Sequence, residues 1–202
     1  MKRLDFIASL LKGYDTVLDI GSDHGYVLKK ALDQNFIKKG IASEIAEGPL
    51  ANAKSNLLNY PVTFYLSDGF DKIVADFDIA VISGMGVYTI IDIINKGPKK
   101  TLILQPNDKL EVLREYLSNN GYKIVNEYIT FDKFYYIILK VEPGMENLSD
   151  EDIYLGPKLK QNPDAKDYYK QKYDQLNEIL LVCDPVTKKT VTKQLNYLKK
   201  VI

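Results

Sequence analysis

The sequence has one cysteine, one histidine and no tryptophan among its 202 residues. A lone Cys183 argues against a disulfide scaffold and against a zinc site built from cysteines. Because no cluster of histidines, cysteines and carboxylates has the spacing of metal ligands, we expect no metal. No apolar run approaches the roughly 20 residues of a membrane helix. The N-terminal MKRLDFIASLL lacks a cleavage-site pattern, so we expect a cytoplasmic protein without a membrane partner.

The chain also lacks net charge, because 27 basic residues balance 27 acidic ones. Any nucleic-acid partner must therefore be held by local patches and not by the field of the whole molecule. Hydrophobic residues make up 46% of the chain, which is enough for one globular core and a small appendage.

The most informative stretch is VLDIGSDHGYV, residues 17–27. Val17, Leu18 and Ile20 are typical of a buried strand, and Gly25 opens the helix that follows. A glycine at a strand-to-helix turn lets the backbone approach a ligand, and the helix N-terminus offers unpaired N–H groups. This pattern indicates a nucleotide-type cofactor site at the first crossover of a doubly wound sheet.

The loop in this stretch also indicates the charge of its ligand. A dinucleotide-binding turn has the pattern G-x-G-x-x-G, whereas this loop is D-x-G-x-D-x-G with Asp19 and Asp23. Carboxylates repel a pyrophosphate but suit a cation, and S-adenosylmethionine carries both a sulfonium and an ammonium group. An ordinary strand-to-helix turn with an aspartate cap is the simpler alternative.

The order of apolar segments predicts the fold. Five segments are each taken as a strand followed by a helix, and a pair of strands closes the series. The five strands are expected at residues 17–20, 41–45, 62–66, 79–82 and 101–104, and the closing pair at 122–129 and 134–141. The closing strands are too close in sequence for a crossover, so they must be antiparallel. Residues 1–143 are thus expected to form an α/β, Rossmann-like, doubly wound and mostly parallel seven-stranded sheet.

Every polar or glycine-rich cluster in this region follows a predicted strand. The clusters are residues 19–25, 44, 68–69, 83–86 and 105–107. Ligands of doubly wound sheets bind beyond the carboxyl ends of the strands. Glu44 lies about twenty residues past the glycine loop, where such folds hold ribose hydroxyls. Asp68 could accept the exocyclic amine of an adenine, although Asp-Gly is also a common turn.

After Pro143-Gly144 the pattern changes to a linker and a coiled-coil-like antiparallel helical hairpin, residues 144–202. The expected apolar stripes are Tyr169, Tyr173, Leu176 and Leu180 on the first helix and Val191, Leu195, Leu198 and Ile202 on the second. The second helix lacks acidic residues and holds Lys188, Lys189, Lys193, Lys199 and Lys200. These lysines form either a phosphate-binding face or an ordinary solvated surface.

Five motifs together resemble the bacterial tRNA (adenine(22)-N1)-methyltransferases. They are DIGSDHGY, SEIAEGP, SDGF, ISGMG and LQPN, in this order. The resemblance covers about residues 1–143 and continues more loosely into LGPKL and the hairpin. Val87 departs from it, since a third small residue is expected there. The resemblance implies a class I fold that uses S-adenosylmethionine and no metal, with tRNA as partner.

The resemblance also implies roles for individual residues. Those expected at the methionine end of the cofactor are Asp19, Gly21, Asp23, His24 and Gly25. Glu44 is expected to hold the ribose, and Asp68 and Gly69 the cofactor adenine. Gly84, Met85 and Gly86 are expected between the cofactor and the target base.

Adenine N1 has an in-plane lone pair, so the reaction needs alignment and exclusion of water more than a strong base. Asp23 is the best-placed carboxylate to stabilise the cationic product, and Gln105 and Asn107 are candidates to hold the base edge. The target base must be extruded or unpaired, because N1 lies on its Watson–Crick edge. His24 is expected either to hydrogen-bond within the loop or to carry a proton. A tyrosine, Tyr26 or Tyr88, is a candidate to stack on the target base.

For tRNA binding, we expect a clamp between the pocket and the basic hairpin, with Lys2 and Arg3 contributing beside the hairpin lysines. We expect a monomer. Two other functions remain open from the residues alone. They are methylation of a small molecule, and a non-enzymatic RNA-binding or protein-binding module on the same fold. An NAD-dependent enzyme is disfavoured by the missing third glycine and the acidic loop.

Overall fold

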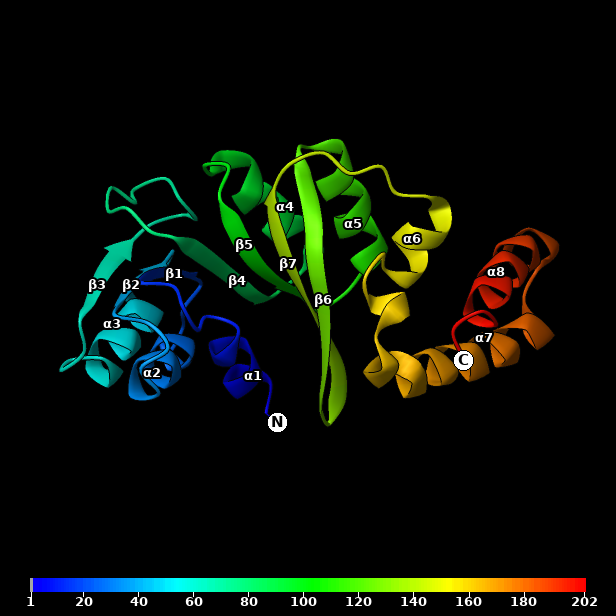
Figure 1. Cartoon of the computed structure of the whole chain (residues 1–202), viewed down its shortest axis with the longest axis horizontal. Coiled ribbons are helices and arrows are strands. Elements are labelled where there is room, and N and C mark those ends of the chain that lie inside the picture. Colours follow the sequence, from blue (N-terminus) through cyan, green and yellow to red (C-terminus); the bar gives the residue numbers. More distant parts are fainter. Residues whose placement is uncertain (1) are drawn as a thin grey trace.

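The computed structural model describes residues 2–202 and has a seven-stranded sheet at its centre (Figure 1). The strand order is β3-β2-β1-β4-β5-β7-β6, and β7 runs antiparallel to the other six strands. The strands are β1 (Thr16–Ile20), β2 (Lys39–Glu44), β3 (Val62–Leu66), β4 (Ile79–Met85), β5 (Thr101–Pro106), β6 (Tyr122–Asp132) and β7 (Phe134–Pro143). The predicted fold class is confirmed.

Helices cover both faces of the sheet. The first five are α1 (Arg3–Ser9), α2 (Tyr26–Asp33), α3 (Glu47–Asn56), α4 (Val87–Lys96) and α5 (Leu110–Asn119). Successive side chains of a strand point to opposite faces, and β1 accordingly packs Val17 against α1 and α2 and Leu18 into the cluster of α4 and α5. Burial on both faces explains why the central strands are continuous apolar runs.

The expectation of five strand–helix units is wrong at one place, because no helix connects β3 to β4. Residues 67–78 form turns instead. Phe70 and Phe77 hold this connection to the core, with ring centroids 6.0 Å apart. Between them Ile73 also packs against the core, but Val74, which has helical spacing with Phe70 and Phe77, is 88% exposed, so the segment does not present one apolar helical face to the core. The strand expected at 79–82 also extends to Met85.

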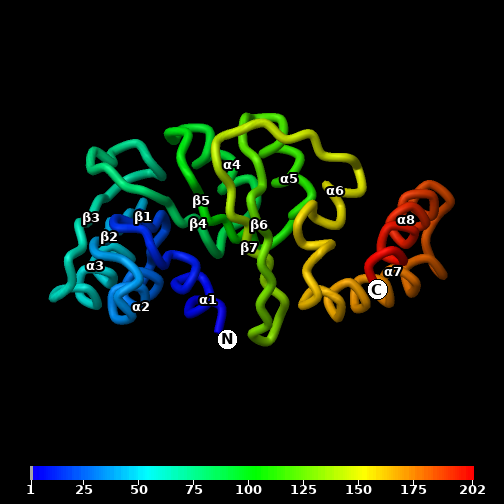
Figure 2. Tube along the Cα trace, in the orientation of Figure 1, coloured from blue at the N-terminus to red at the C-terminus, as the bar shows by residue number. Residues whose placement is uncertain are grey.

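The C-terminal segment contains α6 (Asp150–Leu155), two 3₁₀ turns (Leu159–Gln161 and Pro163–Ala165), α7 (Lys166–Val182) and α8 (Pro185–Leu198). The helical hairpin of α7 and α8 lies at the opposite end of the molecule from α2 and α3 (Figure 2). Asp184 caps α8 by accepting the N–H groups of Val186 and Thr187. The predicted stripe is wrong at Ile202, which follows the end of α8 and is 41% exposed.

Buried side chains join the C-terminal segment to the sheet. Leu155, Leu159, Tyr169 and Leu198 belong to the same hydrophobic cluster as the α4–α5 face. The hydrophobic core is therefore continuous across residue 143. The domain boundary there stays a prediction from the sequence.

Candidate active site

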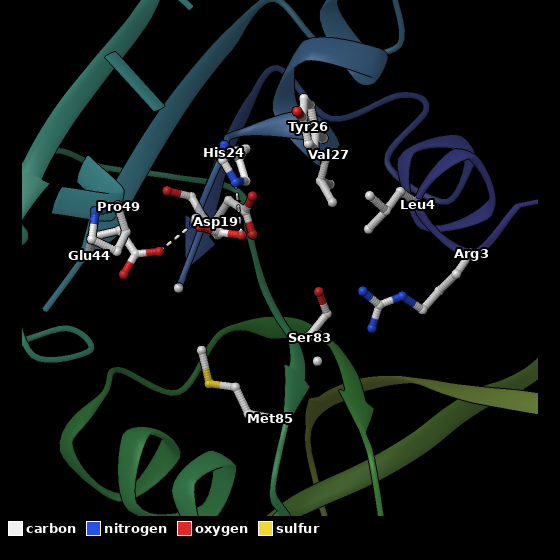
Figure 3. A pocket seen from close by; sticks show the side chains of 14 residues that line it. Arg3, Leu4, Asp19, His24, Tyr26, Val27, Glu44, Pro49, Ser83 and Met85 are labelled. Carbon is white, nitrogen blue, oxygen red and sulfur yellow. Dashed lines mark hydrogen bonds and ion pairs between the residues drawn. The ribbon is translucent and has the colours of Figure 1, made fainter. Parts of the chain in front are cut away.

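A cleft of about 400 Å³ opens at the carboxyl ends of β1, β2 and β4 (Figure 3). Its residues come from the loop after β1, from Glu44 of β2, from the end of β4 and from α1. The sequence motifs that were predicted to meet at this edge of the sheet do so, because parallel strands bring their carboxyl ends together.

The loop after β1 is held in a tight left-handed shape. Gly21 and Gly25 both have φ of +70°, and Asp23 has φ of +49°. A Cβ on Gly21 would lie 2.0 Å from the Met85 methyl carbon. A Cβ on Gly25 would lie 2.4 Å from Leu57 Cδ1, so Gly25 is required where α2 packs on α3. Gly25 thus shapes the loop without lining the cleft, whereas Gly21 does line it.

Two acidic side chains lie at the floor of the cleft. Asp19 is 3% exposed and Glu44 is 7% exposed. Burial, reinforced by the nearby Glu44 carboxylate, raises the pKa of Asp19 to about 7. Glu44 accepts a hydrogen bond from the backbone N–H of Asp23 and so holds the loop over the cleft. A cationic ligand would relieve the repulsion between these two carboxylates.

The Ser22 hydroxyl oxygen is buried and lacks a hydrogen-bond partner among residues 2–202. Ser22 lines the cleft beside Asp19 and Gly21. A buried polar group without a partner is rare and costly. An unpartnered hydroxyl next to a buried carboxylate fits the ammonium and carboxylate of an amino-acid ligand, which supply both a donor and an acceptor.

A second cleft of about 250 Å³ adjoins the first on the side of β3 and α4. Asp68 and Gly69 line it, and Asp68 is ion-paired with Lys96 at 2.7 Å. Gly21, Glu44 and Met85 line both clefts. The Met85 side chain thus lies between them, and a ligand that spans both must contact or displace it.

On the opposite wall, Arg3 of α1 reaches the cleft. Its Nη1 donates to Gln105 Oε1 at 2.7 Å, and its guanidinium lies 5.3 Å from the centre of the Tyr136 ring. Gln105 is 0% exposed, and its amide nitrogen donates to the Pro106 carbonyl. In this arrangement Gln105 holds Arg3 and does not face the cleft, contrary to its predicted place at a base edge. Asn107 donates to the Gly84 carbonyl at 2.8 Å and so supports the end of β4.

Of the other predicted site residues, some line the cleft and some lie outside it. Asp23 and His24 line the cleft, and the Asp23 side chain at its rim is 66% exposed. His24 stacks on Tyr26 with ring centroids 5.3 Å apart. Gly84 and Met85 also line the cleft, while Gly86 is the N-cap of α4. Tyr88 lies outside the cleft, with Lys109 Nζ 4.7 Å from its ring centre.

The lysines predicted to bind nucleic acid also differ from one another. Lys193 and Lys200 are ion-paired with Asp150 and Glu151 of α6. Within residues 2–202, no carboxylate pairs with Lys188, Lys189 or Lys199. Lys2 lies outside the main cleft, in a neighbouring pocket with Arg3 and Asn107.

Sequence reasoning missed several cleft residues, of which Ser22 and Ser83 are polar. Both lie inside motifs that were recognised, at the positions next to the glycines. Their proximity to a ligand could have been expected from that placement. The apolar lining residues Leu4, Val27 and Pro49 have no comparable signal, because their patterns match ordinary helix packing.

Two kinds of feature are absent from residues 2–202. No three side chains of histidine, cysteine, aspartate or glutamate gather as a group that could hold a metal ion. No helix in that range combines the length and the apolar character needed to cross a bilayer.

The strand order and the acidic cleft at the strand ends define a class I S-adenosylmethionine-dependent methyltransferase. Residues 17–202 match the model of the tRNA (adenine(22)-N(1))-methyltransferase family. The chain belongs to this family and is accordingly a tRNA-modifying enzyme that uses S-adenosylmethionine.

Individual relatives agree with this membership. The tRNA (adenine(22)-N(1))-methyltransferase of Bacillus subtilis is 32% identical over 166 residues, which cover 77% of this chain and 70% of that protein. The crystal structure of the B. subtilis m1A22 tRNA methyltransferase is 27% identical with a TM-score of 0.84, over 100% of this chain and 97% of that chain. Streptococcus pneumoniae Sp1610 in complex with S-adenosyl-L-methionine is 29% identical with a TM-score of 0.88, over 100% and 98% of the two chains.

Proposed function

We propose that this chain transfers a methyl group to N1 of adenine 22 in tRNA, with S-adenosylmethionine held across both clefts. The observation that carries the proposal is the buried pair of Asp19 and Glu44 beside Gly21, next to the unpartnered Ser22 hydroxyl. This set of groups suits a cation with an amino-acid end and would disfavour a diphosphate.

Each cleft supplies groups for a different part of the cofactor. Asp19 and Ser22 of the first cleft bind the amino-acid end and face the positive charge. Glu44, at the border of both clefts, has a second carboxylate oxygen for the ribose hydroxyls while its first holds the Asp23 N–H. Asp68 and Gly69 of the second cleft receive the adenine.

S-adenosylmethionine supplies an electrophilic methyl carbon attached to a sulfonium. The adenine N1 lone pair forms the new bond without prior loss of a proton, so the protein needs no general base to begin the reaction. The residues around the cleft align the base, exclude water and stabilise the positive charge that arises on the product. Asp23 has the side chain for the last of these roles, since it lies at the rim of the cleft where a base would enter.

The hairpin is proposed to hold the tRNA backbone. Toward its C-terminal end, Lys188, Lys189 and Lys199 are exposed and have no partner carboxylate in the described chain, whereas Lys193 and Lys200 are partly neutralised by α6. Electrostatic contacts to phosphates supply most of the sequence-independent affinity of nucleic-acid-binding proteins. The enzyme is further proposed to act as a monomer in the cytoplasm, where its tRNA substrate is found; light scattering of the free and tRNA-bound protein tests the first point.

The test is to map the methylated nucleotide after incubation of tRNA with labelled S-adenosylmethionine. We expect one labelled adenine, at position 22, and a stop of reverse transcription there because N1 lies on the Watson–Crick edge. A tRNA with guanine at position 22 is the matched control and should remain unlabelled. Label at another nucleotide would contradict the proposal. Cofactor binding without transfer to any tRNA would favour a small-molecule substrate.

A further inference from the structure

The hairpin formed by β6 and β7 carries exposed aromatic side chains at its tip. Phe131 is 59% exposed and Phe134 is 69% exposed. They flank Lys133, an exposed residue with φ of +67° at the turn. The hairpin extends beyond the sheet, and its tip lies between α1 and the start of α7 (Figures 1 and 2).

The strand register shows which side of the hairpin each phenylalanine occupies. Phe131 pairs with Tyr135, and their rings are 5.0 Å apart. Tyr135 in turn meets Tyr168 of α7 at 5.6 Å, so this face is turned toward the helical hairpin. The neighbouring pairs Asp132–Phe134 and Thr130–Tyr136 point to the opposite face.

This opposite face contacts Arg3, which lines the active-site cleft. Tyr136 lies under the Arg3 guanidinium, and Asp132 Oδ2 accepts the backbone N–H of Arg3 at 3.5 Å. Arg3 lines both the main cleft and a pocket of about 370 Å³ that also contains Asp132 and Tyr136. Phe134 lies two residues beyond Tyr136 on the same face, about 7 Å further along the strand.

Phe134 differs from the other aromatic residues of this face in having no partner. Within residues 2–202 it makes no ring contact and belongs to neither hydrophobic cluster. Lys133, Lys2 and Arg3 give its surroundings a positive charge, offset in part by Asp132. The pocket also holds Asp5, whose carboxylate is already paired with Lys30. An exposed aromatic ring with cations around it is the combination that binds unpaired nucleobases, since the ring stacks and the cations meet the phosphates.

We infer that the β6–β7 tip is a base-stacking site, in which Phe134 stacks on an unpaired nucleotide of the tRNA next to the target adenine. The site rests on the proposed function, because the tRNA must enter the cleft past this face. An extruded adenine leaves a neighbour without its stacking partner, and a ring at the tip replaces that partner. Lys133 approaches the backbone of the same nucleotide, and Phe131 stays with Tyr135 on the α7 side.

The test compares Phe134→Ala with Phe134→Trp in steady-state methylation of tRNA. Loss of stacking on one base weakens binding by about 5- to 150-fold, so we expect the KM for tRNA to rise at least about fivefold in Phe134→Ala. The KM for S-adenosylmethionine and the melting temperature should not change, because Phe134 touches neither the core nor the clefts. Phe134→Trp should restore tRNA binding, since a larger ring stacks as well.

Val74→Ala is the matched control, because Val74 is an exposed apolar residue in the β3–β4 connection. As a direct measurement, p-benzoylphenylalanine at position 134 should cross-link on irradiation to a nucleotide adjacent to position 22. An unchanged KM for tRNA in Phe134→Ala, or a cross-link to a distant part of the tRNA, would overturn the inference. These results are separable from a failure of the proposed function, in which the wild-type enzyme itself would leave adenine 22 unmethylated.

Discussion

At the scale of single residues, the fold strongly raises the pKa of Asp19. Burial and the charge of Glu44 raise its pKa to about 7, against 3.8 for a free aspartate. Below this value the carboxyl group is largely protonated and neutral, and above it the group is negative. A cationic ligand favours the negative form, so ligand binding and proton release are coupled at this side chain.

We therefore predict that the affinity for S-adenosylmethionine rises by about tenfold or more between about pH 5.5 and about pH 7.5. Titration calorimetry at several pH values measures this dependence. Asp19→Asn should bind more weakly at the upper pH and lose most of the dependence, because an amide does not ionise.

Asp15→Asn is the control for this prediction. Asp15 pairs with Lys38 at 2.9 Å on the surface before β1, and its replacement should leave the pH dependence intact. If Asp19→Asn kept the same slope as the wild type, another group would be responsible for the coupling.

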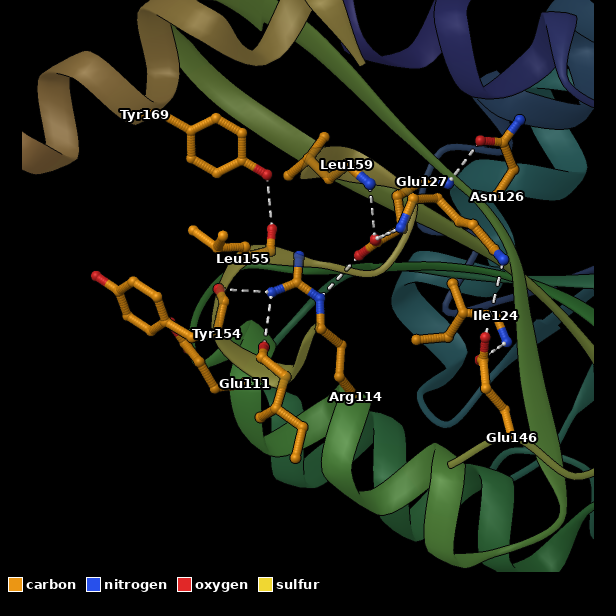
Figure 4. Close-up of polar contacts among 12 residues, drawn as sticks. Glu111, Arg114, Ile124, Asn126, Glu127, Glu146, Tyr154, Leu155, Leu159 and Tyr169 are labelled. Atoms are coloured by element: carbon orange, nitrogen blue, oxygen red, sulfur yellow. Dashed lines mark hydrogen bonds and ion pairs between the residues drawn. The ribbon is translucent and has the colours of Figure 1, made fainter. Parts of the chain in front are cut away.

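Among the elements, α6 is fixed to the sheet by a buried ion pair (Figure 4). Arg114 of α5 and Glu127 of β6 are 2.8 Å apart, with side chains 2% and 0% exposed. Arg114 donates to the carbonyls of Ile153 and Tyr154 at the end of α6. Glu127 accepts the N–H groups of Lys158 and Leu159 after it. The pair thus satisfies carbonyls at the end of α6 and N–H groups at the start of the 3₁₀ turn that follows, which have no partners within their own helices.

Glu127→Ala should destabilise the protein by about 3–5 kcal/mol, because it leaves a buried arginine without its counter-ion. The free energy of unfolding in urea measures the effect. Glu142→Ala is the control on the adjacent strand, since the Glu142–Lys123 pair is exposed and 3.8 Å apart. Its loss should cost less than about 1 kcal/mol. Equal effects of the two substitutions would contradict the anchoring role.

The contacts of Arg114 and Glu127 also determine what deletion of the C-terminal segment would do. Removal of everything after residue 143 would expose Arg114 and Glu127 together with the hydrophobic surface under Leu155 and Leu159. Loss of cofactor binding in such a truncation would reflect unfolding of the sheet. Point substitutions in α8 are therefore the cleaner way to separate tRNA binding from cofactor binding.

Across the whole molecule, β1 and β2, whose carboxyl ends line the cleft, lie toward one end and α8 toward the other (Figures 1 and 2). The chain is neutral overall, so a tRNA that reaches both must be held by local charges. The five lysines of α8 and the two residues after it divide into two that pair with α6 and three that lack a carboxylate partner within residues 2–202. Lys188, Lys189 and Lys199 are therefore the lysines most available to bind phosphates and to displace the counter-ions of the tRNA.

We predict that replacing Lys188, Lys189 and Lys199 together by alanine weakens tRNA binding and flattens its salt dependence. Each lost phosphate contact lowers the slope of log K against log salt by about 0.7–0.9. Filter binding across a salt series measures the slope. Replacing Lys193 and Lys200 should change the slope less, since each is already paired. Equal slopes for the triple variant and the wild type would place the tRNA backbone elsewhere.

The sequence by itself determined the seven strands, the meeting of the acidic and glycine motifs at one edge, and the helical hairpin. These features depend on local patterns, such as the apolar run before Asp19 and the capping of α8 by Asp184, which a reader of the chain can recognise. The same patterns failed between β3 and β4, where the chain packs Phe70 and Phe77 against the core without forming a helix and leaves Val74 exposed.

Only the tertiary structure decided the contacts between distant segments. Gln105 was expected to face a base, but it holds Arg3 from the other end of the chain. Met85 divides the cleft because β4 is next to β1 and not next to β3. Lys193 meets Asp150 across 43 residues. Such contacts depend on which elements become neighbours in space, and no local property of the chain encodes that arrangement.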